Sequence, residues 1–311
     1  MRMFLAGGIT GNLNPFWRCL SQKLKTGQEF KIAGEEAMRI FLAGGESRHW
    51  IHDTLLNKSQ EDMQIYIAGT WPYRNLGDYD PTVFKYKPFI LESFYYVDED
   101  TERLLPYFGD FLLDSGAFTF MQGNHNGKIQ WEEYVDSYSD FILRNKVEKF
   151  FELDIDSVVG YENVLKLRKR LEKKTGKECI PVWHKSRGIE EFKKDADRYS
   201  YIAIGGIVSK EITKDQYKAF PAMIKEAHKR KCKIHGLGFT SLEWLTKCHF
   251  DSVDSTAWTT GNRFGYIYKF NGETMEKIDV PDGQRISKPR ETALINFTEW
   301  IKFQKYAETH L

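Results

Sequence analysis

The sequence predicts an α/β fold in which a parallel sheet closes into a (β/α)8 barrel. From residue 111 onward, apolar runs of four to six residues alternate with helical stretches. These runs are continuously apolar, which is typical of parallel strands whose outer face is covered by helices. The length of 311 residues also suits one such barrel. An open, doubly wound sheet is the alternative.

The expected barrel strands can be placed in order. The first is 65–69, the central six are 111–114, 149–156, 179–184, 201–206, 233–238 and 250–255, and the eighth candidate is 265–270. Amphipathic stretches such as 131–146 and 162–174 follow the central strands and predict the covering helices. An Asn-Gly pair predicts a hairpin turn after the eighth candidate, and 291–306 predicts a final helix.

Three related segments open the chain: "MRMFLAGG" (1–8), "MRIFLAGG" (38–45) and "MQIYIAGT" (63–70). Each is a strand-like apolar run that ends at glycine. Their unequal spacing argues against a solenoid. We therefore expect an N-terminal extension with a duplicated strand motif over 1–62 and a catalytic barrel over 63–311, with extra strands before it and a hairpin and helix after it.

Composition restricts the partners. The formal net charge is +1, so any nucleic-acid contact must use local Lys and Arg patches. No apolar run approaches the roughly 20 residues that span a bilayer, which predicts a cytoplasmic protein without membrane contact. The four cysteines are scattered, and the possible zinc ligands Cys232, His235, Cys248 and His249 lack the tight paired spacing of zinc sites. We expect neither a metal nor a cofactor.

Polar residues recur where the predicted strands end. They are Asp114, Asp154, Asp156, His184, Gly205, Gly206, His235, Gly236, Asp251 and Asp254. A single aspartate at such a position is usually a helix cap. In a parallel barrel, however, the carboxyl ends of all strands meet on one face, where catalytic groups converge. The recurrence therefore predicts a site on this face.

Two aspartates without a metal framework suggest a nucleophile and a general acid/base, as in retaining glycosyl transfer. One carboxylate attacks the anomeric carbon and forms a covalent glycosyl-enzyme. The other moves a proton to the departing group and from the arriving one, which requires a pKa tuned by its surroundings.

Five motifs resemble those of tRNA-guanine transglycosylases, in the same order. They are "LDSGAF" (113–118), "ELDID" (152–156), "YIAIGGI" (201–207), "HGLG" (235–238) and "FDSVDSTAWTTGNRFG" (250–265). The residues of these motifs are most similar to those of the DNA 7-deazaguanine transglycosylase group of phage and prokaryotes. The zinc segment with which the tRNA enzymes dock their substrate is missing, which favours DNA over tRNA.

The resemblance implies a role for each matching residue. Asp254 becomes the nucleophile at C1′ and Asp114 the general acid/base, with Asp251 structural. The base would be held by Asp154, His184, Gly205, Gly206, Ser115 and Phe118. His184 stands where the tRNA enzymes have a glutamine, which leaves the identity of the base open. The nucleic-acid contacts near the rim would be Lys185, Arg187, Arg263 and Trp258.

The expected partner is DNA, as a single strand or with a flipped-out nucleotide, together with a free 7-deazapurine base; a homodimer is also open. The first alternative is a DNA glycosylase in which water resolves the intermediate and leaves an abasic site, as in defence against phages with modified bases. A barrel that only binds nucleic acid is another. A fourth reading is a barrel enzyme for a phosphorylated metabolite, with a phosphate site at "TTGNRFG" (259–265).

Overall fold

A computed structural model of the chain describes residues 63–69, 87–116, 119, 130–239, 241–279 and 289–311. Two compact units can be distinguished, one built from 63–70 and 89–255 and the other from 1–62, 71–88 and 256–311. The first two repeats of the N-terminal extension and Phe118 lie outside the described residues. The third repeat provides the first barrel strand.

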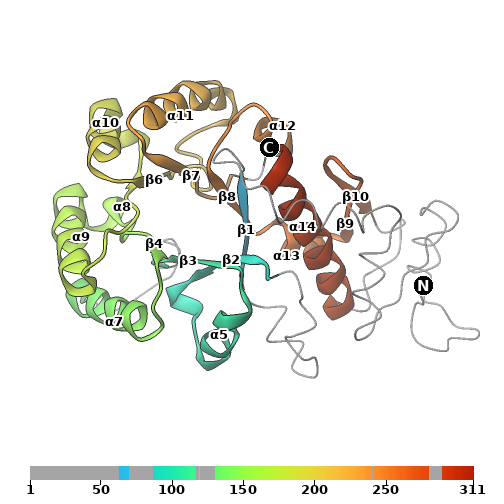
Figure 1. The fold of residues 1–311 in the computed structure, drawn as a ribbon, viewed down its shortest axis with the longest axis horizontal. Helices are drawn as coiled ribbons and strands as arrows, with labels where there is room; N and C mark the ends of the chain where they lie inside the picture. The colour runs from blue at the N-terminus through green and yellow to red at the C-terminus, as the bar shows by residue number, and fades with distance from the viewer. Residues whose placement is uncertain (1–62, 70–86, 117–118, 120–129, 240, 280–288) are drawn as a thin grey trace, which may run out of the picture. The chain divides into compact units, whose positions relative to one another are not determined.

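Eight parallel strands form the ring seen in Figure 1. They are β1 (Gln64–Ala68), β2 (Phe89–Ser93), β3 (Asp110–Asp114), β4 (Lys149–Phe150), β5 (Val182–Trp183), β6 (Tyr201–Ile204), β7 (Lys233–Gly236) and β8 (Ser252–Ser255). Their spatial order is β4-β3-β2-β1-β8-β7-β6-β5, so neighbours in sequence pair and β1 lies beside β8. This arrangement confirms the predicted α/β barrel class.

The ring closes between β4 and β5. Phe151 and Ile180 form a parallel bridge just beyond these short strands. The Glu152 amide donates to the Ile180 carbonyl over 3.0 Å, and the Ile180 amide donates to the Phe150 carbonyl over 2.8 Å. These bonds leave no open edge at this seam, which excludes the open doubly wound sheet.

Helices follow the strands around the ring (Figure 1). They are α5 (Glu99–Leu104), α7 (Trp131–Arg144), α8 (Asp156–Val159), α9 (Tyr161–Thr175), α10 (Gly188–Arg198), α11 (Phe220–Lys229) and α12 (Leu242–Leu245). Pro221 stands in the first turn of α11, where its missing N–H costs no helical hydrogen bond. The 3-10 helix Lys214–Ala219 precedes this start of α11.

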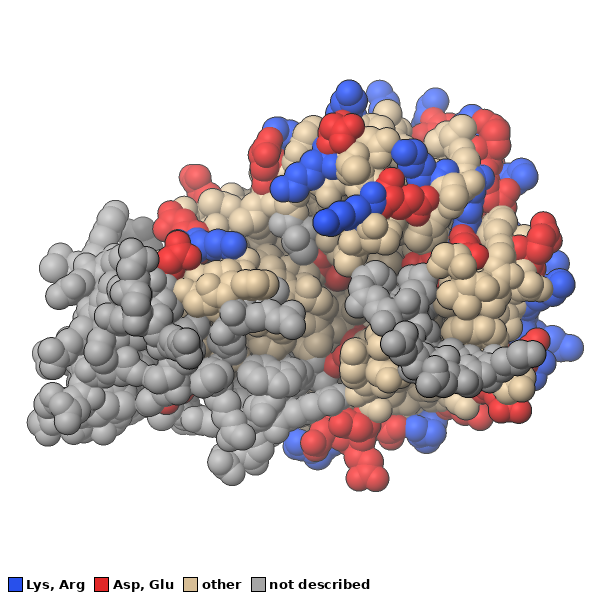
Figure 2. All heavy atoms as spheres, turned by 180° about the vertical axis from the view of Figure 1, so that it is seen from behind, with Lys and Arg blue, Asp and Glu red and all other residues tan. Residues whose placement is uncertain are grey.

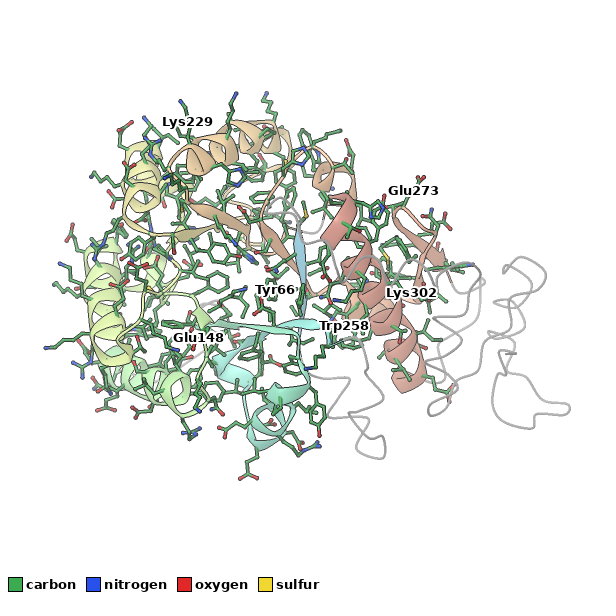
Figure 3. The ribbon with its side chains drawn as sticks, viewed as in Figure 1. Tyr66, Glu148, Lys229, Trp258, Glu273 and Lys302 are labelled. Atoms are coloured by element: carbon green, nitrogen blue, oxygen red, sulfur yellow. The ribbon has the colours of Figure 1, made fainter. Side chains whose placement is uncertain are left out.

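Two apolar cores hold this layer architecture together. The inner one fills the ring with alternate strand residues, among them Tyr66, Leu112, Phe151 and Val182. Figure 3 shows Tyr66 within the ring, whereas Lys229 lies at its outer edge. The outer core packs the opposite strand faces against α7 and α9. Both faces of the strands are therefore buried, which explains their continuously apolar sequence.

The prediction of the eighth barrel strand was wrong. The candidate at 265–270 does not join the ring, because β9 (Tyr266–Phe270) pairs antiparallel with β10 (Met275–Asp279). The ring is completed instead by β2, whose apolar run "FILES" lies between β1 and β3. The sequence after this run shows no helical periodicity, because the next helix, α5, has only six residues. The run was therefore not predicted as a barrel strand.

The described part of the second unit contains α13 (Ala257–Phe264), the β9–β10 hairpin and α14 (Pro289–His310). The predicted hairpin and final helix are confirmed. The Asn271 side chain accepts from the Glu273 and Thr274 amides and so builds the hairpin turn. Among the described residues, no helix combines the length and the apolar character that crossing a membrane requires.

Candidate active site

The strand ends place four acidic or imidazole side chains of the barrel unit on its C-terminal rim. Asp114 ends β3, Asp154 follows β4, His184 follows β5 and Asp254 stands in β8. Because all eight strands run parallel, these positions face the same end of the barrel. The charges of Asp154 and Asp254 both act on Asp114. The structure therefore gathers these four predicted residues at one end of the ring.

Asp114 is partly exposed and has a strongly shifted pKa. Burial raises this pKa, the Gly116 amide that donates to Oδ2 over 3.1 Å opposes the rise, and the charges of Asp154 and Asp254 add to it. The outcome is a pKa of about 7, compared with an ordinary value of 3.8. Near neutral pH such a carboxyl group can both give and take a proton.

Asp254 is buried and is held by one of its two oxygens. Oδ1 accepts from the Gly238 amide over 2.5 Å, and His235 Nε2 lies 3.2 Å from the same atom. Gly238 has a φ of +69°, which favours glycine and turns its N–H toward the carboxylate. Oδ2 has no hydrogen-bond partner within the described part of the chain. Only one of the two carboxylate oxygens is therefore held by the described residues.

His184 lies between two carboxylates. Its Nε2 is 2.5 Å from Asp154 Oδ1, and its Nδ1 is 2.7 Å from Glu211 Oε2. Burial alone would lower the pKa of His184, but the bonds and charges of Asp154 and Glu211 outweigh it and raise this pKa to about 9. At neutral pH the ring is therefore an imidazolium that donates to both carboxylates. Its nitrogens are not available to read a base.

Glu211 is a site residue that the sequence analysis missed. Its second oxygen, Oε1, accepts from the Ser186 amide over 2.8 Å, so the loop after β6 is tied to the loop after β5. Glu211 is 27 positions from His184, and its segment "VSKEI" has no recognisable pattern. Only the fold brings the two together.

Gly205 and Gly206 make room for this charged chain. A Cβ on Gly205 would lie 3.0 Å from the His184 ring, and one on Gly206 would lie 2.9 Å from Glu211. The Gly205 amide donates to the Trp183 carbonyl, and the Gly206 carbonyl accepts from Ile212. Two of the four backbone groups that were expected to hold a base are thus engaged within the protein. The glycines act here mainly through their small size.

Ser115 is fully buried beside Asp114. Its carbonyl accepts a hydrogen bond from the Tyr134 hydroxyl over 2.5 Å. Its Oγ has no hydrogen-bond partner within the ranges that the structure describes. A buried hydroxyl without a partner costs stability unless a ligand or water satisfies it.

Arg187 does not suit the predicted phosphate contact. Its side chain is 2% exposed, and its guanidinium donates to Glu152 over 2.9 Å and to Asp156 over 2.6 and 2.8 Å. It also lies over the Tyr161 ring. Arg187 is therefore a structural residue that joins the start of α10 to β4 and α8. Lys185, two residues earlier, is exposed, and its phosphate contact stays a prediction.

Trp258 and Arg263 belong to α13 in the second unit. Trp258 is 0% exposed and packs edge-on against Phe297, so it is a core residue and does not suit the predicted nucleic-acid contact. The Arg263 side chain lies outside the described residues. The predicted phosphate loop "TTGNRFG" is largely helical, as part of α13.

The suggested zinc ligands do not form a site. Cys232, His235 and Cys248 are all buried, and His235 uses its ring nitrogens on Ser252 and Asp254. Within the ranges that the structure describes, no group of three or more His, Cys, Asp and Glu side chains is arranged to hold a metal ion.

Comparison with known proteins gives little guidance. No protein-family model and no curated protein matches the chain. Among solved structures, QR15, an aldolase, has a TM-score of 0.41 and 11% identity over 65% of this chain and 92% of its own. The carboxyl transferase domain of Rhizobium etli pyruvate carboxylase with pyruvate has a TM-score of 0.43 and 10% identity, over 92% of this chain and 55% of its own. Similarities at this level carry no argument about this chain.

Proposed function

We propose that the protein is an enzyme that exchanges a guanine-type base in DNA for a 7-deazaguanine derivative through a covalent Asp254–deoxyribosyl intermediate. The observation that carries the proposal is that two aspartates on one rim have different environments. Asp114 has a pKa of about 7, whereas Asp254 has one oxygen fixed by Gly238 and the other without a partner among the described residues. Two carboxyl groups in different environments suit an acid/base and a nucleophile.

The reaction follows from this assignment. Asp254 Oδ2 attacks C1′ of the nucleotide, and the bond from C1′ to the base breaks as Asp114 gives its proton to the departing base. The product is a deoxyribosyl ester of Asp254. An incoming 7-deazapurine then loses a proton to Asp114 and attacks C1′, which releases the Asp254 carboxylate. Each proton and electron pair is returned at the end of the cycle.

Asp154 is the group best placed to select the base. Its Oδ1 is taken by His184, whereas Oδ2 has no hydrogen-bond partner in the described part of the chain. Oδ2 of this carboxyl group can therefore accept from a ring N–H or an amino group. The Watson–Crick edge of guanine offers two such donors, which supports a guanine-type substrate.

The decisive experiment traps the intermediate. The protein is mixed with DNA that carries unmodified or modified guanine, and the mixture is denatured and analysed by mass spectrometry for a protein–DNA adduct and for released base. We expect an adduct at Asp254. In Asp254→Asn, its rate of formation should fall by at least ~10³-fold, the scale seen when a covalent nucleophile is removed.

Asp140→Asn is the matched control, because Asp140 is an exposed aspartate on α7. Its rate should equal that of the wild type. Normal activity in Asp254→Asn, or an adduct at another residue, would refute the mechanism. Omitting the free 7-deazapurine distinguishes the two outcomes of the intermediate: abasic sites without added base identify a DNA glycosylase, and dependence on the added base identifies exchange.

A further inference from the structure

A chain of polar side chains runs through the barrel interior below Asp254. His235 of β7 and Ser252 of β8 are both fully buried, and Ser252 stands two residues before Asp254 on the same strand face. His235 Nδ1 lies 2.5 Å from Ser252 Oγ, and Ser252 Oγ is in hydrogen-bond contact with the Tyr201 hydroxyl of β6. The chain thus leads from Tyr201 to the carboxylate.

If His235 is neutral, the hydrogen bonds in this chain can all point in only one direction. An ionised Asp254 only accepts, so His235 Nε2 carries the proton and Nδ1 is the acceptor. The single hydroxyl proton of Ser252 then points to Nδ1, and that of Tyr201 points to Ser252. Each group donates toward the carboxylate.

The reverse order of hydrogen-bond donors would leave the Tyr201 hydroxyl proton without an acceptor among the described residues. With an imidazolium, Ser252 would accept from Nδ1 and donate to the Tyr201 oxygen. The Tyr201 proton would then need another acceptor, and the described residues offer Tyr201 no partner except Ser252. The faces of the His235 ring lie near the Tyr66 and Phe151 rings, at centroid distances of 6.1 and 5.2 Å.

We propose that the Tyr201–Ser252–His235 chain fixes His235 in its Nε2–H tautomer and so positions Asp254, with Oδ1 held and Oδ2 as the attacking atom. His235 is a positioning residue, because it acts on the substrate only through Asp254. The consequence of this chain for the reaction rate depends on the proposed function, whereas the tautomer of His235 does not.

The first test needs no substrate. The 311-residue chain is labelled with [15N]histidine, and the His235 signals are assigned by their loss in His235→Gln. At neutral pH, the 15N shifts should show a neutral ring with the proton on Nε2. In Ser252→Ala, which removes the donor to Nδ1, the fraction of rings that carry a proton on Nδ1 should rise. A wild-type ring that carries its proton on Nδ1, or on both nitrogens, overturns the proposal without any variant.

The second test measures the rate of adduct formation with DNA. Ser252→Ala should slow it about tenfold to a hundredfold, the scale of leaving one buried acceptor, here His235 Nδ1, without its donor. Ser139→Ala is the matched control, because Ser139 is equally buried but donates to the Val135 carbonyl within α7. Its rate should not change.

A conservative replacement separates positioning from packing. The side-chain amide of His235→Gln can still donate to Asp254, whereas His235→Leu cannot, so the glutamine variant should keep more activity than the leucine variant. Equal rates in these two variants, or an unchanged rate in Ser252→Ala, would contradict the proposal.

The tests also distinguish the two hypotheses. The expected tautomer without any DNA adduct leaves the chain intact and rejects the proposed function. An adduct at Asp254 together with a His235 proton on Nδ1 supports the proposed function and rejects the proposed role of the Tyr201–Ser252–His235 chain.

Discussion

At the scale of single residues, the site depends on giving similar carboxyl groups different environments. Asp114 is partly exposed, lies near two negative charges and has a raised pKa, whereas Asp254 is buried, receives the Gly238 amide and lies against His235. Hydrogen bonds to a carboxylate stabilise its charged form, and burial near like charge destabilises it. Under the proposed function, this difference in surroundings separates the acid, Asp114, from the nucleophile, Asp254.

The raised pKa of Asp114 predicts a pH-dependent cost in stability. In the unfolded chain this group titrates near 3.8 and in the folded protein near 7, so the folded state binds the proton more tightly. Its contribution to the free energy of unfolding is fully present below about pH 4 and is lost as the pH rises through 7, a decline of about 2–4 kcal/mol.

Asp114→Asn should remove this decline. Urea unfolding at pH 5 and pH 8 should show that the variant gains stability relative to the wild type at the higher pH. The difference between the two proteins cancels the titration of other groups, such as His184. A wild type and variant whose unfolding free energies change in parallel with pH would show that the Asp114 pKa is not raised.

Residue-level prediction from sequence succeeded where a strand determines the position of a side chain. Asp114 and Asp254 stand at or near strand ends, so the barrel alone places them on one rim. The partners of His184 and Arg187 lie 27 and 35 positions away, at Glu211 and Glu152. Nothing local in the sequence marks such pairs, and Arg187 was consequently taken for a surface cation.

At the scale of elements, α9 shows how one helix uses two faces. Arg168 points into the protein and donates to Glu152 over 2.6 Å and to Asp195 over 2.9 Å, with all three groups buried. Arg170, two residues later, pairs with Asp136 at the surface. This network ties α9 and α10 to the segment that carries Asp154.

Arg168→Leu is predicted to destabilise the protein by about 3–5 kcal/mol, because it leaves buried carboxylates with too few partners. Arg170→Leu is the matched control from the same helix and should change the free energy of unfolding little, since exposed pairs are solvated in both states. Urea unfolding of both variants measures the difference. Similar losses in the two would mean that the buried network contributes no more than a surface pair.

Elements were predictable where the sequence pattern lasts long enough. The strands followed by long amphipathic helices, such as α7 and α9, were recognised from their period. Strand β2 was missed because a 3-10 turn and a six-residue helix follow it. The run 265–270 was misplaced because an apolar strand has the same pattern in a hairpin as in a barrel, and only its partner decides.

At the scale of the whole molecule, charge is the property that bears on a DNA partner. The formal net charge is +1, and Figure 2 shows Lys and Arg interspersed with Asp and Glu on the face in view. A chain with this balance has no strong field to attract a polyanion. Under the proposed function, affinity must come from the flipped base and a few local cations such as Lys185.

This argument predicts a shallow salt dependence of DNA binding. The logarithm of the binding constant should fall with the logarithm of salt concentration at a slope that corresponds to about three phosphate contacts or fewer. Fluorescence anisotropy with the Asp254→Asn variant measures binding without turnover. Lys185→Ala should weaken binding and reduce the slope by about 1. Lys229→Ala, which changes a lysine that is 71% exposed on the outer helix α11, should alter neither quantity. A slope that corresponds to six or more contacts would show that a basic surface dominates binding, and the local-contact interpretation would then be wrong.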